Sequence, residues 1–298
     1  MHFGILGAGA VGCYYGARLA QAGHRVTLVG RPAFAEAVAA HGLRLKTAEF
    51  DGAVAVDGAS DASALAGCEV VLFCVKSGDT EEAGRQLLPH LGPETVVLSL
   101  QNGVDNAERL SAVLGRSVVP AAVYVASEMA GPGHVLHHGR GELVIGDSPA
   151  NATLTKVLPQ AGIPVTVSDT VIRSLWEKLV LNCAYNALSA VTQMPYGQIV
   201  AVEGVKETME DVRRECIAVA GALGIALKDP TIDYILGLAR TMPNQFSSTA
   251  QDMARGKATE IDHLNGYVVR KGADLGVSTP VNRLLVAMVK LAEAKMGA

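Results

Sequence analysis

The 298-residue sequence lacks a long uninterrupted apolar run, so no membrane-spanning helix is expected. It also lacks a cluster of lysine and arginine, and its formal net charge is −4 at pH 7. Neither a nucleic acid nor an anionic membrane is therefore an expected partner. Glycines interrupt the apolar start of the sequence and no basic leader precedes it, so we do not expect a secretory signal peptide. These absences favour a cytoplasmic protein.

The sequence also lacks paired cysteines and the spacing of a metal site. Its five cysteines are odd in number, and no two have C-x-x-C spacing. Most lie in apolar segments, so we predict reduced core thiols. His134, His137 and His138 lie near one another, but no set of carboxylates or histidines with metal-ligand spacing accompanies them. We predict that these histidines are exposed hairpin residues, and no metal is expected.

Aromatic residues make up only 4% of the chain, although 49% of it is hydrophobic and it contains 32 glycines. This composition is typical of an α/β protein with a large core. The length exceeds that of a usual single domain, so two domains are expected.

The first glycines of the chain form a dinucleotide-binding motif. They have G-x-G-x-x-G spacing, follow an apolar strand and open a helical segment over residues 10–22. The first glycine allows a tight turn, the second lets the backbone approach a pyrophosphate, and the third lets helix and strand pack closely. The helix N-terminus offers N–H groups to the phosphates, whereas the alternative is an ordinary strand–helix turn. The expected cofactor-binding residues of this loop are Gly7, Ala8, Gly9, Ala10, Val11 and Gly12.

The end of the second strand indicates which cofactor the motif binds. NAD-specific domains carry an acidic residue about 20 residues past the glycines, where it binds the ribose 2′-hydroxyl. Here that place holds Gly30-Arg31-Pro32, without a carboxylate to repel a 2′-phosphate. Arg31 could bind the phosphate through charge-assisted hydrogen bonds, which favours NADP over NAD. The alternative is a solvated arginine in a turn.

Polar residues also follow two strands that are expected to be buried. The apolar run 70–75 ends at Lys76, and the run 95–100 ends at Gln101-Asn102-Gly103. Ligands of doubly wound sheets bind outside the carboxyl ends of the strands, so Lys76 could meet a cofactor phosphate and Asn102 a nicotinamide amide or substrate oxygen. A surface lysine and a turn asparagine are the competing interpretations.

The pattern of the chain changes near residue 168. Up to that point we predict strands and helices, with a hairpin turn at residues 50–53 and a strand-rich segment over 118–146. Beyond it the chain is expected to be almost wholly helical, with breaks that include Asp229-Pro230. The predicted fold is α/β: a Rossmann-type doubly wound domain over residues 1–168, followed by an all-α domain over residues 169–298.

The first helix of the second domain carries an unusual polar stripe. Lys178, Asn182 and Asn186 fall at i, i+4 and i+8 and share one helical face, while their neighbours are apolar. Such a stripe is costly to bury unless it lines a polar cavity, although a solvent-exposed face is the alternative. Further along, the segment of Ser248 can be explained as a helix start with a serine cap, and that of Glu260 as a helix with an acidic first turn. Physical reasoning alone therefore does not assign either residue to the site.

The chain resembles the ketopantoate reductase (2-dehydropantoate 2-reductase) family, and the likeness runs from its first glycines to its last helix. Several separated motifs carry the likeness in the family's order. They are Gly7-Ala8-Gly9-Ala10-Val11-Gly12, Arg31, Lys76, Gln101-Asn102-Gly103, the Lys178/Asn182/Asn186 helix, Ser247-Ser248-x-x-Gln251-Asp252 and Glu260-Ile261-Asp262-x-x-Asn265-Gly266.

The resemblance implies a role for each matching position. Lys178 would be the catalytic general acid. The implied substrate-binding residues are Asn102, Asn182, Asn186, Ser248 and Glu260. The implied cofactor-binding residues outside the glycine loop are Arg31, Lys76, Asn102 and Glu260.

The activity that the resemblance implies is NADPH-dependent reduction of 2-dehydropantoate to pantoate, in pantothenate and coenzyme A biosynthesis, in a cleft between the two domains. As hydride reaches the carbonyl carbon of a 2-oxo acid, negative charge grows on the oxygen, which a lysine ammonium can stabilise and protonate. The alternatives are a dehydrogenase acting on another 2-oxo or hydroxy acid and a non-catalytic NADPH-sensing module. A helical second domain is compatible with a homodimer, but the sequence does not count the subunits.

Overall fold

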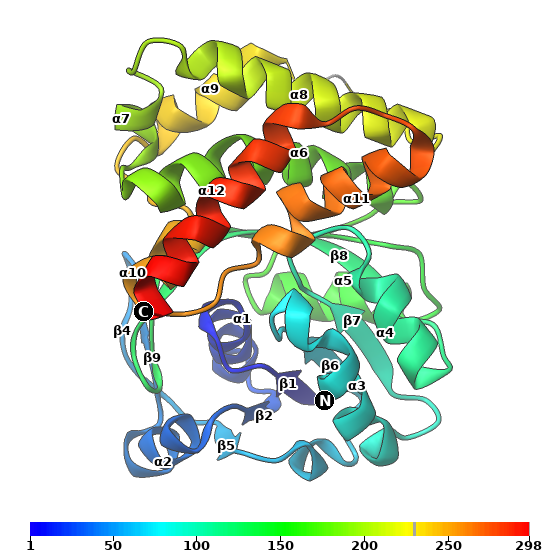
Figure 1. Cartoon of the computed structure of the whole chain (residues 1–298). Helices are drawn as coiled ribbons and strands as arrows, with labels where there is room; N and C mark the ends of the chain where they lie inside the picture. Colours follow the sequence, from blue (N-terminus) through cyan, green and yellow to red (C-terminus); the bar gives the residue numbers. More distant parts are fainter. Residues whose placement is uncertain (229–230, 298) are drawn as a thin grey trace. The chain divides into compact units, whose positions relative to one another are not determined.

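The computed structural model describes residues 1–228 and 231–297, and the chain divides into two units, Met1–Val171 and Ile172–Ala298 (Figure 1). The division falls in the first turn of helix α6 (Val171–Thr192), close to residue 168, where the sequence pattern changes from mixed strands and helices to helices. The helix break predicted at Asp229-Pro230 lies outside the described residues.

The N-terminal unit is built on a mixed sheet. Within the described residues its strand order is β4-β3-β9-β8-β7-β6-β1-β2-β5, and β10 pairs with β9. The strands are β1 (His2–Leu6), β2 (Arg25–Val29), β3 (Leu43–Lys46), β4 (Asp51–Val54), β5 (Asp57–Ala59), β6 (Val70–Phe73), β7 (Val96–Ser99), β8 (Val119–Gly131), β9 (His134–Ile145) and β10 (Val165–Val167). The run from β8 to β5 is parallel, whereas β8 and β9 form an antiparallel hairpin whose turn lies at Gly131-Pro132-Gly133.

Helices cover both faces of this sheet. They are α1 (Ala10–Gln21), α2 (Pro32–His41), α3 (Thr80–Leu87), α4 (Asn106–Leu114) and α5 (Asn151–Gln160), with 3₁₀ turns at Ala62–Leu65, Ser77–Asp79 and Leu88–His90. The α/β class and the Rossmann-type N-terminal unit are confirmed.

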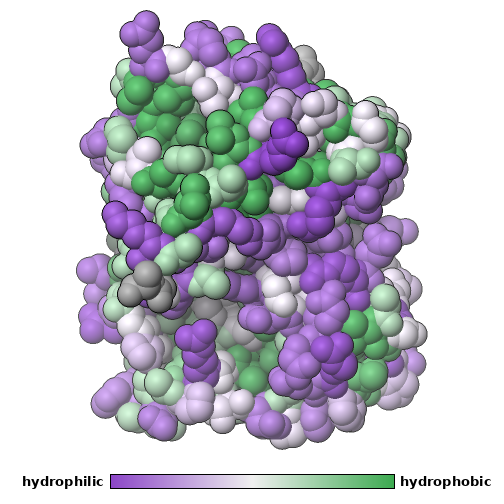
Figure 2. Space-filling view, viewed as in Figure 1, coloured by the Kyte–Doolittle hydropathy of each residue, from purple (hydrophilic) through white to green (hydrophobic). Residues whose placement is uncertain are grey.

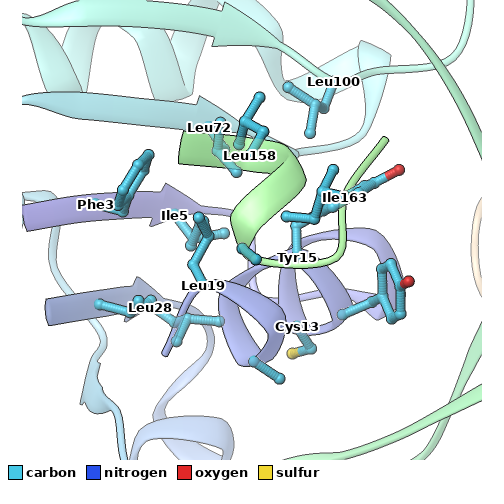
Figure 3. Packing of buried hydrophobic residues seen from close by; sticks show 14 of the residues in the cluster. Phe3, Ile5, Cys13, Tyr15, Leu19, Leu28, Leu72, Leu100, Leu158 and Ile163 are labelled. Atoms are coloured by element: carbon cyan, nitrogen blue, oxygen red, sulfur yellow. The ribbon is translucent and has the colours of Figure 1, made fainter. Parts of the chain in front are cut away.

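Alternation along the central strands sorts their side chains into two hydrophobic clusters. Val70 and Leu72 of β6 pack into the cluster around α1, and Val71 and Phe73 pack into the cluster against α3 and α4. Figure 3 shows the first cluster, in which Leu72 lies among residues of β1, β2, α1 and α5. Burial on both faces explains why these parallel strands are continuous apolar runs in the sequence.

The hairpin turn predicted at residues 50–53 is wrong by a few residues. Residues 51–54 form strand β4, which pairs with β3, and the turn spans Thr47–Phe50. The Thr47 hydroxyl accepts hydrogen bonds from the N–H groups of Glu49 (3.1 Å) and Phe50 (3.0 Å), which closes the turn earlier than the Asp-Gly pair suggests.

The β3–β4 hairpin also joins the sheet at an unexpected place. β3 pairs in parallel with β9 and not with β5, its neighbour in sequence beyond β4. Helix α1 therefore contacts strands near both ends of the sheet, including β2 and β4.

The C-terminal unit is helical within the described residues. After α6 its helices are α7 (Tyr196–Ile199), α8 (Val205–Ala222), α9 (Ile232–Thr241), α10 (Ser248–Ala254), the 3₁₀ turn η4 (Ile261–His263), α11 (Asn265–Leu275) and α12 (Pro280–Gly297). Helix α6 supplies much of the core: Trp176 and Tyr185 are buried, and the Tyr185 hydroxyl donates to the carbonyl of Ile235 in α9 (2.9 Å).

The surface of this unit is partly apolar. Leu284, Met288 and Leu291 follow one another at helical spacing on α12 and are exposed, and Figure 2 shows apolar residues along this helix. None of the described helices is both long and apolar enough to cross a membrane.

Candidate active site

The glycine loop is shaped by contacts that exclude side chains. Gly7 has a φ of +104°, and a Cβ there would lie 2.6 Å from the carbonyl carbon of Cys74 and from the N–H nitrogen of Val75. A Cβ on Gly12 would collide with the carbonyl oxygen of Gly7 and lie 2.8 Å from the Ile5 side chain. Both positions therefore require glycine, as the motif predicts.

The remaining glycine of the motif leaves an open approach to the helix N-terminus. A Cβ on Gly9 would have no neighbour within 4 Å. Gly9 is the N-cap of α1, no side chain caps the helix, and its first turn holds no acidic residue. The first N–H groups of a helix have no partner inside it, so this end fits the phosphates of a dinucleotide.

Arg31 stands beyond the end of β2, at the N-cap of α2. Its side chain is exposed, and it has no ion-pair partner among the described residues. The first turn of α2 also holds no acidic residue. An accessible guanidinium without a carboxylate beside it fits a 2′-phosphate.

The structure brings Lys76 and Asn102 onto adjacent loops. β6 and β7 are parallel and in register to Phe73 and Ser99, so the loops that follow them start side by side. The Ser77 hydroxyl, next to Lys76, donates to the carbonyl oxygen of Asn102 (2.8 Å). The two predicted residues at the carboxyl edge of the sheet therefore belong to segments that are bonded to each other.

In the C-terminal unit, Lys178, Asn182 and Asn186 lie on α6 as the spacing predicts. Lys178 and Asn182 are partly buried, and Asn186 is only 2% exposed. Neither asparagine side chain makes a hydrogen bond to any other residue that the structure describes. The two amides are therefore available for hydrogen bonds to a ligand, which is the role that the sequence predicts for this face of α6.

Ser247 attaches the segment that carries Ser248 to the same helix. Its hydroxyl donates to the Asn186 carbonyl (3.3 Å) and accepts the N–H of Ala250, which caps α10. Its own N–H donates to the Ser189 hydroxyl (3.2 Å). Ser248, the first residue of α10, is exposed.

Asn265 attaches the segment that carries Glu260. Its side-chain amide is fully buried and donates to the carbonyl of Cys183 on α6 (3.1 Å) and to the Asn282 side chain (2.9 Å). Glu260 lies at the start of η4, just before this anchor, and is partly buried. Two separate motifs are thus fixed to consecutive turns of the helix that carries Lys178.

The cysteines and histidines do not form a second reactive centre. All five cysteines are free thiols, and burial raises the pKa of Cys13 to about 12 and that of Cys68 to about 11, which makes both poor nucleophiles. Of the three histidines predicted to be exposed, only His138 is: His134 is partly buried, and the ring of His137 stacks on Tyr14 at 4.3 Å and bonds the Arg140 carbonyl (2.7 Å).

Sequence analysis missed the residues that hold the site residues in place. Ser77 and Asn106 in the N-terminal unit were not singled out, and Asn265 in the C-terminal unit was named only as part of a motif that carries the family resemblance. Small polar residues in otherwise apolar or helical surroundings are the signal that could have singled them out, because buried polar groups require partners.

Comparison with known proteins identifies both units. Residues 3–150 match the family model described as "Ketopantoate reductase PanE/ApbA", and residues 170–293 match the one described as "Ketopantoate reductase PanE/ApbA C terminal". A curated relative, the 2-dehydropantoate 2-reductase of Caulobacter vibrioides, is 34% identical over 291 residues, which cover 97% of this chain and 98% of the relative.

Solved structures agree. The crystal structure of a PanE/ApbA family ketopantoate reductase from Ralstonia eutropha JMP134 is 55% identical with a TM-score of 0.97, and the match covers 100% of both chains. A ternary structure of D-mandelate dehydrogenase with NADH and anilino(oxo)acetate has a TM-score of 0.94 and covers 100% of both chains, but at 22% identity it shows the fold alone.

The two neighbouring serines should behave differently when replaced by alanine. Ser247→Ala removes a helix cap and a buried hydrogen bond, so the free energy of unfolding should fall by about 1–2 kcal/mol. Ser248→Ala is the matched control: Ser248 is exposed, so stability should stay within about 0.5 kcal/mol of the unmodified protein. Denaturant unfolding measures both, and equal losses would contradict the anchoring role of Ser247.

Proposed function

The chain belongs to the ketopantoate reductase family, and on that premise we propose that it reduces 2-dehydropantoate to pantoate with NADPH. The observation that carries the proposal is the polar face of α6, where two asparagine amides without hydrogen bonds among the described residues share a face with Lys178. A lysine that shares a helical face with two amides available for hydrogen bonding is suited to a small oxygen-rich acid. This reaction would place the protein in pantothenate and coenzyme A biosynthesis.

The residues of the N-terminal unit fit NADPH. The open backbone at Gly9 and the uncapped start of α1 can take the pyrophosphate, and the accessible Arg31 can take the 2′-phosphate. Lys76, at the carboxyl edge of the sheet, would add a positive charge near the cofactor. The neighbouring Asn102 can offer both a donor and an acceptor to a carboxamide or a substrate oxygen.

The residues of the C-terminal unit would do the acid–base chemistry. NADPH supplies the hydride for the carbonyl carbon of the 2-oxo acid. Lys178 would stabilise the charge that develops on the carbonyl oxygen and then donate its proton there. Asn182, Asn186 and Ser248 would orient the carboxylate and hydroxyl of the substrate. Glu260 would accept a hydrogen bond from a substrate or cofactor hydroxyl.

The first test is the oxidation of NADPH, followed by its absorbance, with purified protein and 2-dehydropantoate. Pyruvate, 2-oxoisovalerate and 2-oxo-2-phenylacetate run in parallel, each with NADPH and with NADH. We expect turnover to be fastest with 2-dehydropantoate and NADPH. Turnover with only one of the other acids would support the reaction class but contradict 2-dehydropantoate as the substrate. NADPH binding without any turnover would favour a sensing module.

Lys178→Ala should lower kcat about 10²- to 10⁴-fold, because it removes the proton donor, while the affinity for NADPH stays nearly unchanged. Lys178→Arg keeps the positive charge but cannot release a proton readily, so it should recover little of the rate. Lys206→Ala, an exposed lysine of α8, is the control. Near-normal turnover of the alanine variant would rule out the general-acid role.

Arg31→Ala should weaken NADPH binding about 10- to 100-fold, because a charge-assisted contact with the 2′-phosphate is lost. Binding of NADH, which has no such phosphate, should change far less. Arg85→Ala serves as control, since Arg85 is exposed and pairs with Glu82 of its own helix. Titration with each nucleotide gives the two dissociation constants. An equal loss of affinity for NADPH and NADH would contradict the assignment of Arg31 to the 2′-phosphate.

A further inference from the structure

A buried polar cluster lies behind the loops that carry Lys76 and Asn102. Its members are almost fully buried, although each bears a hydroxyl or amide group. They are Ser77, Thr80, Ser99, Gln101 and Asn106. The proposed chemistry uses none of them, and apolar residues would fill the same space without the cost of burying polar atoms.

Asn106, the first residue of α4, is the centre of this cluster. Its Nδ2 donates to the carbonyl oxygen of Asn102 (2.6 Å) and to the Ser77 hydroxyl (3.2 Å). Its Oδ1 accepts from the Thr80 hydroxyl (3.2 Å) and from Arg109 Nη1 (3.2 Å). Since two donors face the oxygen and two acceptors face the nitrogen, the orientation of the amide is fixed by its surroundings.

Arg109 ties the same cluster to the loop after β6. Its Nη2 donates to the carbonyl oxygen of Ser77 (2.9 Å), and its Nε and Nη2 each bond the Glu81 carboxylate at 2.7 Å. The pair of bonds to Glu81 is bidentate, which holds the guanidinium in one orientation. Asn106 therefore receives a rigid donor from one side and holds the Asn102 backbone on the other.

We propose that Asn106 is a positioning residue for the nicotinamide nucleotide. It fixes the loop after β6 and the loop after β7 in one arrangement, so that Lys76 and Asn102 meet the cofactor without reordering. Preorganised groups bind more tightly because less conformational freedom is lost on binding. This inference rests on the proposed function, since it takes the two residues as cofactor ligands.

The test is Asn106→Asp, which keeps the shape of the side chain. The carboxylate still accepts from Thr80 and still pairs with Arg109, so the variant should fold, with a melting temperature that is several degrees lower because the two hydrogen bonds donated by the amide nitrogen are lost. However, an acceptor then faces the Asn102 carbonyl, which displaces that loop. We expect the dissociation constant of NADPH to rise about tenfold, with a matching rise in its KM and a smaller change in kcat.

The matched control is Asn151→Asp in the same unit. Asn151 starts α5 and donates to the Gly146 carbonyl (3.3 Å) and to Asp147 (3.2 Å), apart from the loops that follow β6 and β7. This variant should bind NADPH like the unmodified protein, whatever its melting temperature. A merely structural Asn106 would likewise change stability and leave the dissociation constant of the folded protein unchanged.

The outcomes separate the two proposals. If the unmodified protein binds NADPH and Asn106→Asp binds it equally well, the positioning role is overturned and the proposed function stands. If the unmodified protein binds neither NADPH nor NADH, both fail. Should Asn106→Asp not fold, Ser77→Ala, which removes the other donor to the Asn102 carbonyl, should still raise the dissociation constant about threefold, and an unchanged value would overturn the inference.

Discussion

The N-terminal unit depends on a contact between two stretches of backbone with no side chain between them. Gly7 touches the peptide that joins Cys74 to Val75, and Gly12 touches the carbonyl of Gly7. These contacts hold the ends of β1 and β6 together with the start of α1. The loops that follow the parallel strands β1, β2, β6 and β7 emerge at one edge of the sheet, where the proposed cofactor-binding residues of this unit lie.

Much of this arrangement could be predicted from the sequence. β6 and β7 are recognisable because parallel strands buried on both faces are continuous apolar runs, and the glycine spacing marks the loop before α1. The placement of the β3–β4 hairpin could not be predicted, because its pairing with β9 joins residues some 90 positions apart, such as Arg44 and His134. The turn at Thr47–Phe50 was misplaced because a hydroxyl hydrogen bond outweighed an Asp-Gly pair.

The candidate site could likewise be predicted only in part from the sequence. Helical spacing places Lys178, Asn182 and Asn186 on one face, and the family resemblance adds Ser248 and Glu260. What the sequence could not show is how the last two reach α6, since Ser247 and Asn265 bond its carbonyls from 61 and 82 residues away. The pattern of polar and apolar residues indicates which residues are buried. It does not indicate which backbone carbonyl accepts a hydrogen bond, because every residue has one.

The pairing of β3 with β9 has a consequence for synthesis on the ribosome. Helix α1 is complete after residue 21, yet strands β8 and β9, which pack against it, end only at residue 145. In a nascent chain, the part of the α1 surface that packs against β8 and β9 therefore stays uncovered until those strands have been translated, although β1 and β2 are available to α1 much earlier. Because long-range pairings close late, the sheet cannot be completed until β9 has been synthesised.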